Sequence, residues 1–369
     1  MQTAFSSRVG DDIGESGAEV AEIHKPPIPF HYQEEVPQFV GPEIERLYAN
    51  LYSSLPHLAI EGRLDDASTY VVRVEGKLTA VMLYEMDGNK VTVLNEVIDL
   101  GRAEIIQFSK YIFGVFKHVQ VICFRAIHTD IRPVPFRIQC FNYLEDMTIA
   151  LPDSEDTYTA MLSPKNRSNL RRKFKSIQAD YPSFEIKCVE KEDIQEEQIL
   201  TLVGFNRARM SAKKKASNYA KAESDRLVQL ARKNGVMMLA LIEGKICGGV
   251  VSYRIGENYF SLMVAHDPKY NEYSLGLLCN YRAICESIRH GAKELHFLWG
   301  RYHYKYTLMA TPRELDFVVL YRSRLAYFFN IGVAARAHGL RLRRKFFLWK
   351  HHHKQEKGMF YRLSKFLPC

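Results

Sequence analysis

The chain has 369 residues, of which 47% are hydrophobic and 25% are charged, and its formal net charge is +9. This length is too great for one small core and favours two domains, and the composition is ordinary for a globular protein. No run of 18 apolar residues occurs and the first residues lack an apolar signal stretch, which argues against a membrane span and against secretion.

Seven cysteines are scattered along the chain, and none forms a Cys-x-x-Cys pair. An odd number of thiols in a large chain is typical of reduced cysteines in the cytoplasm. The clustered Cys and His spacing of a zinc site is missing. We therefore expect a cytoplasmic protein without a bound metal.

The charge is spread unevenly. Residues 1–50 carry three basic and nine acidic residues, whereas residues 339–369 carry nine Lys or Arg and one acid, Glu356. This asymmetry indicates a tail that meets an anionic partner, such as lipid head groups or RNA. A solvated basic helix end would account for it equally well.

The first part of the chain reads as a polar lead-in followed by an α/β unit. Residues 1–40 are polar and contain a small proline cluster, which predicts a flexible segment. Apolar residues at helical spacing then predict a helix over 42–55. The next predicted elements are strands over 70–74, 78–84 and 91–97, a helix over 103–116 and a strand over 119–124.

The second part repeats this order after a helical linker. Ser163 before Pro164 predicts a helix start within a long helix or helix pair over 154–179. A strand over 184–189, a helix over 194–210, a Lys-rich loop over 211–221 and a short helix over 227–233 follow. The repeat itself consists of strands over 236–242, 246–253 and 259–264, a helix over 274–290 and a strand over 294–299. Two Glu-Gly-Lys turns, at Glu75 and Glu243, occupy the same place in both parts, which predicts a duplicated domain.

Four stretches between Ser163 and Leu315 carry a family pattern. They are the basic helix Lys165-x-Arg167-x-x-x-Arg171-Arg172, the hairpin Glu243-Gly244-Lys245-x-x-Gly248-Gly249, the run from Asp267-Pro268 to Gly276 and Cys279, and Phe297-Leu298-Trp299-Gly300 with Tyr304-Lys305. This segment resembles the acetyltransferase domain of the CelD/BioF-like group in the GNAT superfamily. Relatives of that group include the Fem-type peptidyltransferases, which use two tandem GNAT-like folds.

The resemblance implies an α/β (α+β) fold of two tandem GNAT-like copies, with mixed central sheets flanked by helices. We accordingly divide the chain into a lead-in (1–40), a first GNAT-like domain (41–160), a second GNAT-like domain (161–322) and a basic amphipathic tail (323–369). The first copy lacks a Ser-x-Gly helix start, so we expect it to be structural or to bind an acceptor.

The donor site is expected where a strand ends and a helix begins. A helix N-terminus offers free N–H groups and a positive dipole end to a pyrophosphate, and Gly276 permits close approach. The usual Gln/Arg-x-x-Gly-x-Gly/Ala loop is absent, and Ser274-Leu275-Gly276 is its nearest stand-in. An ordinary capped helix remains the alternative. The predicted donor-binding residues are Val264, Ala265, Ser274, Leu275, Gly276 and Leu277.

Acid–base and substrate-binding residues are expected beside this site. Acyl transfer needs a base for the acceptor proton, and His titrates near neutral pH. The catalytic candidates are His266, Asp267, His303 and Tyr304, the last as an acid. The substrate-binding candidates are Lys165, Arg167, Arg171, Arg172, Trp299 and Lys305, with a solvated basic face as the alternative for the helical stripe.

The sequence thus predicts an N- or O-acyltransferase that uses acyl-CoA as co-substrate and holds no permanent cofactor. The resemblance implies a sugar, amino-acid or lipid-linked acceptor from envelope or polysaccharide synthesis. Bulky apolar and basic residues alternate after Arg322, which fits either an interfacial helix on an anionic membrane or a helix packed on the domain. The alternatives are a Fem-like transferase that uses aminoacyl-tRNA and a non-catalytic membrane-surface protein.

Overall fold

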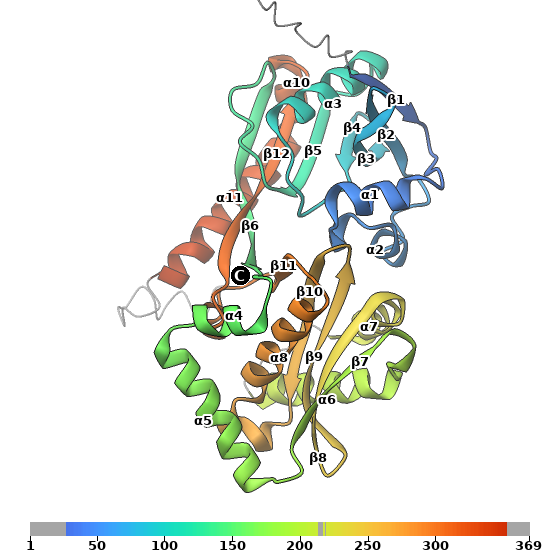
Figure 1. Ribbon diagram of the computed structural model, residues 1–369. Helices are drawn as coiled ribbons and strands as arrows, with labels where there is room; N and C mark the ends of the chain where they lie inside the picture. The colour runs from blue at the N-terminus through green and yellow to red at the C-terminus, as the bar shows by residue number, and fades with distance from the viewer. Residues whose placement is uncertain (1–26, 213–216, 218, 353–369) are drawn as a thin grey trace, which may run out of the picture.

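The computed structural model describes residues 27–212, 217 and 219–352. Its strands form one twelve-stranded mixed sheet in the order β1-β2-β3-β4-β5-β12-β6-β11-β10-β9-β8-β7. In Figure 1 one half of the chain lies above the other, and β6 and β12 run between them.

Both halves carry the same series of elements, which confirms the predicted duplication. The first half consists of β1 (Ile28–Tyr32), α1 (Val40–Tyr48), η1 (Leu51–Ser53), α2 (Leu55–Ile60), β2 (Ser68–Val74), β3 (Lys77–Asp87), β4 (Lys90–Val93), α3 (Arg102–Val115), β5 (Val121–Ile127) and β6 (Arg137–Ala150). The second half consists of α4 (Glu155–Met161), α5 (Pro164–Asp180), β7 (Glu185–Glu190), η2 (Lys191–Asp193), α6 (Glu196–Ala212), α7 (Lys221–Asn234), β8 (Gly235–Ile242), β9 (Lys245–Ile255), β10 (Asn258–His266), η3 (Pro268–Tyr273), α8 (Leu275–Arg289), β11 (Glu294–His296), α9 (His303–Thr307) and β12 (Thr311–Tyr321). Two further helices, α10 (Arg324–Phe329) and α11 (Ile331–His352), end the described chain.

The two halves exchange their last strands. β6 belongs to the first half in sequence but pairs with β11, whereas β12 belongs to the second half and pairs with β5. The two exchanged strands also pair with each other, antiparallel, from Thr311–Thr148 to Tyr321–Arg137. Each half-sheet is therefore completed by backbone hydrogen bonds from the other half.

Arg322 fixes the end of the exchanged strand β12. Its guanidinium donates to the carbonyls of Phe113, Phe116 and Val119, over distances of 2.8, 2.6 and 2.7 Å. These carbonyls lie at and after the C-terminal end of α3, where helix carbonyls lack partners and a cation is favoured.

β6 and β12 are missing from the predicted elements. β6 carries acidic residues at positions that the fold buries, Glu145 and Asp146, which are 1% and 0% exposed. These charges interrupt the apolar alternation by which a strand is detected, because they pair with other buried charges instead of facing solvent.

Several predicted boundaries differ from the structure. The predicted helix 42–55 is divided, because Ala49 has a left-handed backbone (φ 41°) and the side chain of Asn50 accepts from the N–H of Tyr52. The predicted strand 91–97 ends at Val93, and Asn95 Oδ1 accepts the N–H of Leu83 at 2.7 Å in place of a strand partner.

The lead-in and the loop also need correction. Residues 28–32, predicted to be flexible, form β1 and pair with β2; the rest of the lead-in, 1–26, lies outside the described residues. The helix predicted over 227–233 begins already at Lys221. Residues 213–216 and 218 of the predicted Lys-rich loop lie outside the described residues as well. The predicted cap holds, since Ser163 Oγ accepts the N–H of Asn166 at the start of α5.

The tail is docked on the sheet. Ala334 and Ala337 of α11 are buried in one cluster with Val121 and Phe141. Arg344 is 8% exposed and binds Glu145 and Asn142. One face of the predicted amphipathic segment therefore packs on the domain. Among the described helices, none has a stretch long and apolar enough to cross a bilayer.

Candidate active site

The sheet opens between β10 and β11. These parallel strands pair only over Asn258, Tyr259 and Phe260. Beyond Phe260, β10 continues along β9 as far as His266, whereas the chain after His296 turns to β6, where Phe297 N–H donates to Met147 at 2.7 Å. Alternate residues of β10 therefore turn N–H and C=O groups toward the gap instead of toward a neighbouring strand.

The start of α8 lies at this gap. Ser274 has a left-handed backbone (φ 58°), its side chain does not cap the helix, and the first turn contains no acid. A Cβ at Gly276 would lie 3.2 Å from Cγ2 of Val264 and 3.7 Å from Nδ1 of His266. The glycine therefore lets the helix start approach the end of β10, and a helix start of this kind can accept an anion.

The predicted donor-binding residues are thus close together, but they differ in exposure. Ala265 and Leu275 are fully buried, so only their backbone can meet a ligand. Val264, Gly276 and Leu277 are partly exposed and lie around the gap.

The corresponding gap in the first half is closed. Backbone hydrogen bonds join Val97 to Ala126 and Leu100 to His128, and they fill the space between β4 and β5. The carboxylate of Glu104 accepts the Gly101 N–H at 2.7 Å at the start of α3. An acid already holds this helix start, so an anionic ligand is disfavoured there.

The four predicted catalytic residues fall into two groups. At the end of β10, His266 Nε2 lies 2.9 Å from Asn271 Oδ1, and Asp267 accepts the N–H of Lys269 to begin η3. On α9, the ring of His303 is exposed and its Nδ1 lies 3.3 Å from Thr307 Oγ1. Tyr304 is partly buried and packs edge-on against Phe297.

Tyr304 lies near two residues that the sequence did not indicate, Tyr219 and Arg209. Burial, and then Tyr302, raise the pKa of Tyr304 far above its ordinary value. Arg209 lowers this pKa and Tyr219 raises it, both through electrostatic interaction. The hydroxyl of Tyr219 donates to the Leu262 carbonyl on β10 at 2.9 Å. A protonated phenol therefore stands near a cation, and both belong to the surroundings of the gap.

Arg209 lies just before the Lys-rich segment 211–221 and Tyr219 lies within it, and neither residue formed part of a motif in the sequence. The Nε of Arg209 is buried and has no hydrogen-bond partner within the described ranges. Only the fold, which brings this segment back over β10, reveals them as candidates.

Two predicted substrate-binding residues are structural instead. Lys305 is 2% exposed, and its ammonium donates to the carbonyls of Phe297, Leu298 and Trp299. Burial lowers the pKa of Lys305 to about 8. Arg167 donates to the carbonyls of Ala160 and Leu162 at the end of α4. The two side chains hold turns together and are not free for a ligand.

The other substrate candidates lie at the surface or between the halves. Lys165, Arg171 and Arg172 are exposed on α5, whose first turn is tied to α9 by a 2.9 Å bond from Asn166 to the Thr307 carbonyl. Trp299 is partly buried, and its ring centroid lies 5.2 Å from that of Tyr52 in the first half. The first half therefore contributes to the surroundings of the chain that follows β11.

A buried ionic cluster lies where β6 and β11 meet. Nδ1 of His296 is 2.6 Å from Asp146, and its Nε2 is 3.1 Å from Glu294, which also binds Arg313. Burial alone would lower the pKa of His296, but the hydrogen bonds to Asp146 and Glu294 outweigh it and raise the pKa to about 8. At 2% exposure this ring is structural and holds a charge at the crossing of the two halves.

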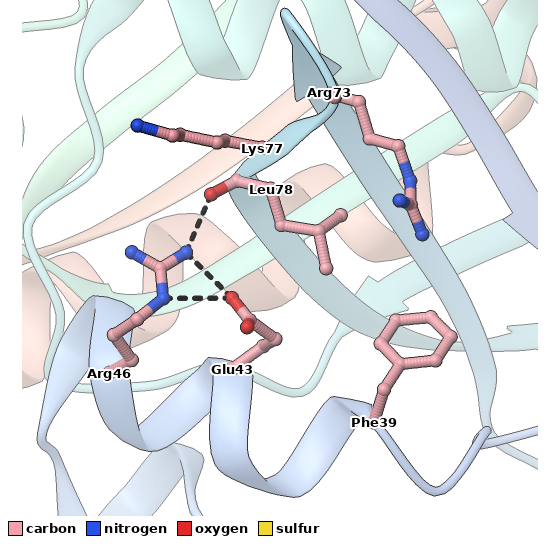
Figure 2. Close-up of a pocket in the computed structure, with 7 residues that line it drawn as sticks. Phe39, Glu43, Arg46, Arg73, Lys77 and Leu78 are labelled. Carbon is pink, nitrogen blue, oxygen red and sulfur yellow. Dashed lines mark hydrogen bonds and ion pairs between the residues drawn. The ribbon is translucent and has the colours of Figure 1, made fainter.

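A hollow of about 410 Å³ at the turn between β2 and β3 is separate from the gap (Figure 2). Arg46 bridges Glu43 and the carbonyl of Leu78, and Lys77 and Arg73 extend on either side. The acid that lines the hollow is thus already paired, and we assign it no reaction.

Comparison with known proteins places the gap inside a recognised domain. Residues 164–306, from the start of α5 into α9, match the family model described as acetyltransferase (GNAT) domain. No match was found among the curated proteins. The expected acyltransferase is confirmed through this domain, whereas the narrower CelD/BioF-like grouping stays a prediction.

Two solved structures share the architecture of nearly the whole chain. FemX is similar with a TM-score of 0.62 and 9% identity, over 83% of this chain and 99% of that one. A conserved protein of unknown function from Bacteroides thetaiotaomicron VPI-5482 is similar with a TM-score of 0.54 and 13% identity, over 79% and 99% of the two chains. At these identities the likeness concerns the fold, and the expected tandem GNAT-like fold is confirmed.

The raised pKa of the buried His296 predicts that the free energy of unfolding falls as the pH rises. Because its pKa is raised from 6.5 to about 8 in the fold, the stabilisation is complete below pH 6.5 and is lost as the pH rises through about 8. We expect the free energy of unfolding to fall by about 1–2 kcal/mol between pH 6 and pH 8. His296→Gln should lose this component, whereas His128→Gln, at an exposed ring, should keep it. Urea unfolding at each pH measures the free energy of unfolding. If the wild type and the two variants showed the same pH dependence, the prediction would be refuted.

Proposed function

We propose that this protein transfers an acyl group from a CoA thioester to an amine or hydroxyl of an envelope or polysaccharide precursor, such as a sugar, an amino acid or a lipid-linked compound. The observation that carries the proposal is the difference between the halves. The second half has an open gap and a helix start without an acid, whereas Glu104 and the chain at Val97–Leu100 close the first half.

The donor would lie along β10. Its phosphates would meet the N–H groups at the start of α8, which the helix dipole makes favourable for anions. Its thioester arm would enter the gap, where the unpaired N–H groups of residues 261–266 would bind its amides and the acyl carbonyl. Thioester and acceptor would thereby be held together, which removes much of the entropic barrier.

The reaction forms a bond between the acceptor N or O and the acyl carbon, and it breaks the bond from that carbon to sulfur. The acceptor loses a proton, and the departing thiolate gains one. Tyr304 is our candidate for the proton donor, because burial keeps its phenol protonated and its ring packs against Phe297, where the chain leaves β11. His266 and His303 remain candidates for the base, His266 at the end of β10 and His303 on α9.

An aminoacyl-tRNA donor is the second candidate. It is favoured by the exposed Lys165, Arg171 and Arg172 on α5, which suit a phosphate backbone, and by a fold like that of FemX. One binding experiment distinguishes the CoA thioester from the aminoacyl-tRNA.

That experiment is thermal unfolding with acetyl-CoA, longer acyl-CoAs, free CoA and bulk aminoacyl-tRNA. A donor at a hundred times its dissociation constant should stabilise the fold by about 2.7 kcal/mol. Gly276→Gln and Gly276→Glu should both weaken the effect of CoA compounds, because either side chain would stand in the space that glycine leaves beside Val264. Gly276→Glu should weaken it further, because it also adds an acid to the start of α8. Stabilisation by aminoacyl-tRNA alone would replace the CoA proposal with the second candidate. If both Gly276 variants bound CoA compounds as well as the wild type, the start of α8 would not be part of the donor site.

Removal of the Tyr304 hydroxyl tests whether Tyr304 is the proton donor. Once the panel has identified a donor, we expect Tyr304→Phe to lower kcat by about a hundredfold or more, with KM changed only a few-fold. Tyr306→Phe, at a 42% exposed ring on the same helix, is the matched control and should leave kcat unchanged. Similar rates for Tyr304→Phe and the wild type would exclude Tyr304 as the proton donor.

We also propose that α10 and α11 bind an anionic membrane surface. Leu325, Phe328 and Phe329 on α10 are 68%, 67% and 85% exposed, and Ile331, Leu342 and Trp349 continue the exposed apolar residues along α11. No Asp or Glu occurs between Asp316 and Glu356, whereas Lys and Arg are frequent. Exposed bulky apolar side chains among basic ones are the pattern of an interfacial helix.

Vesicles containing phosphatidylglycerol test the membrane contact. Replacement of Phe328 and Phe329 by Ser should weaken binding about tenfold or more, because two large apolar side chains would no longer insert. Leu200→Ser, an exposed apolar residue on α6, is the control. Binding should also weaken with salt and on phosphatidylcholine alone. Undiminished binding of the double variant would contradict a contact through α10.

A further inference from the structure

Three side chains that can bind a metal come together near the C-terminal end of α8, and the imidazole of His290 adjoins the two carboxylates among them. Cys188 and Glu190 alternate on β7 and so share one face of that strand, while Glu286 and His290 lie four residues apart at the end of α8. The ligand atoms of Cys188, Glu190 and Glu286 all lie within 4.8 Å of one another. Nε2 of His290 is 3.2 Å from Glu190 Oε1 and 3.4 Å from Glu286 Oε1.

The distances from His290 to the two carboxylates suit a tetrahedral metal site, and the distances to Cys188 would shorten when a metal binds. With metal–ligand bonds of about 2.0 Å to N and O and about 2.3 Å to S, neighbouring ligand atoms are roughly 3.3–3.6 Å apart. The two distances from the imidazole of His290 fall close to this range. The Cys188 sulfur lies 3.9 Å from the nearer oxygen of Glu190, a few tenths of an ångström beyond it.

The imidazole of His290 is oriented for such a role. Its Nδ1 lies 2.5 Å from the hydroxyl of Tyr259, which is 1% exposed. That contact leaves Nε2 turned toward the two carboxylates. Histidines that bind metals are held in this way through their second nitrogen.

The charges gathered here favour a cation. Glu286 is 8% exposed and stands in the last turn of α8, where the helix dipole disfavours anions. Arg289 binds its Oε2 at 2.7 Å, and Oε1 faces His290. Burial, followed by Glu286 and Glu190, raises the pKa of the Cys188 thiol to about 12, and a bound metal would reverse this by holding the thiolate.

We propose that Cys188, Glu190, Glu286 and His290 bind one divalent transition-metal ion, with Zn²⁺ as the best match. One thiolate, one imidazole and two carboxylates suit zinc better than magnesium or calcium, which take oxygen ligands. With four protein ligands the site is closed and structural. It would fasten β7, the edge strand of the sheet, to α8. The donor would lie at the opposite end of this 15-residue helix, about 22 Å away, so the site is independent of the proposed reaction.

The test uses the full chain with His351, His352 and His353 replaced by Ala, so that this triplet does not chelate metal. After treatment with a chelator, Zn²⁺ is titrated in competition with a chromophoric chelator, and Co²⁺ is added as a spectroscopic probe. We expect one ion per chain, the visible bands of tetrahedral Co²⁺, a thiolate charge-transfer band and a rise in melting temperature.

Cys188→Ser should remove the thiolate band, and Cys188→Ser and His290→Gln should each weaken Zn²⁺ binding by about a hundredfold or more. Tyr259→Phe should weaken it by about tenfold, through loss of the second contact of His290. Cys140→Ser, at a partly buried thiol outside the cluster, is the matched control.

Circular dichroism of each metal-free variant separates loss of metal binding from loss of folding. If Cys188→Ser does not fold, Glu190→Gln, at a carboxylate that is 39% exposed, provides the same measurement. Co²⁺ without a thiolate band, or equal Zn²⁺ affinity of wild type and variants, would overturn the proposal and leave the four residues as an ion-pair cluster only.

Discussion

The exchange of β6 and β12 is the constraint on which the rest of the structure depends. Each half-sheet would end at β5 or β11 with an unpaired edge, and the exchanged strands supply the missing hydrogen bonds from the other half. Arg322 and Lys305, which follow and precede β12, each donate to three backbone carbonyls and so fix both ends of that strand. The position of β11, and with it the width of the gap beside β10, is therefore set by a strand from the first half.

The crossing of the halves carries buried charge. Glu145 and Asp146 on β6 are matched by Arg301, Arg344 and His296, which come from the second half and from α11. Burial raises the pKa of Glu145, but hydrogen bonds from Arg344 and Arg301 outweigh this, and the pKa lies below its ordinary value. Removal of one partner from such a cluster leaves an uncompensated charge, so its members hold the halves in a defined register.

Two halves with one topology have come to differ in a few residues at equivalent places. In the first half Asn95 ends β4, the following chain pairs with Ala126 and His128, and Glu104 holds the start of α3. In the second half β10 runs on to His266, and α8 begins without a side-chain cap. In the first half these backbone groups and the helix start are bound by the chain itself, whereas in the second half they are available to the proposed donor.

The sequence by itself determined the local elements and the duplication. The two Glu-Gly-Lys turns, the strands around them and the helices near Arg102 and Leu275 follow from alternation, turn residues and helical spacing, which act over a few neighbours. The basic tail and the place of Gly276 were predictable for the same reason. Whether the predicted donor residues bind a donor stays a prediction, although the fold brings Gly276, Val264 and His266 together.

Only the tertiary structure decided which polar residues are partners. The sequence suggested that Lys305 and Arg167 bind the substrate, but in the fold both side chains donate hydrogen bonds to backbone carbonyls. It missed β12, and it missed β6 because the partners of Glu145 and Asp146 lie more than a hundred positions away. It also passed over Cys188 and His290, which lie on different elements and meet only when β7 packs near α8. Contacts between distant segments leave no periodic signal in the chain, since only folding brings the segments together.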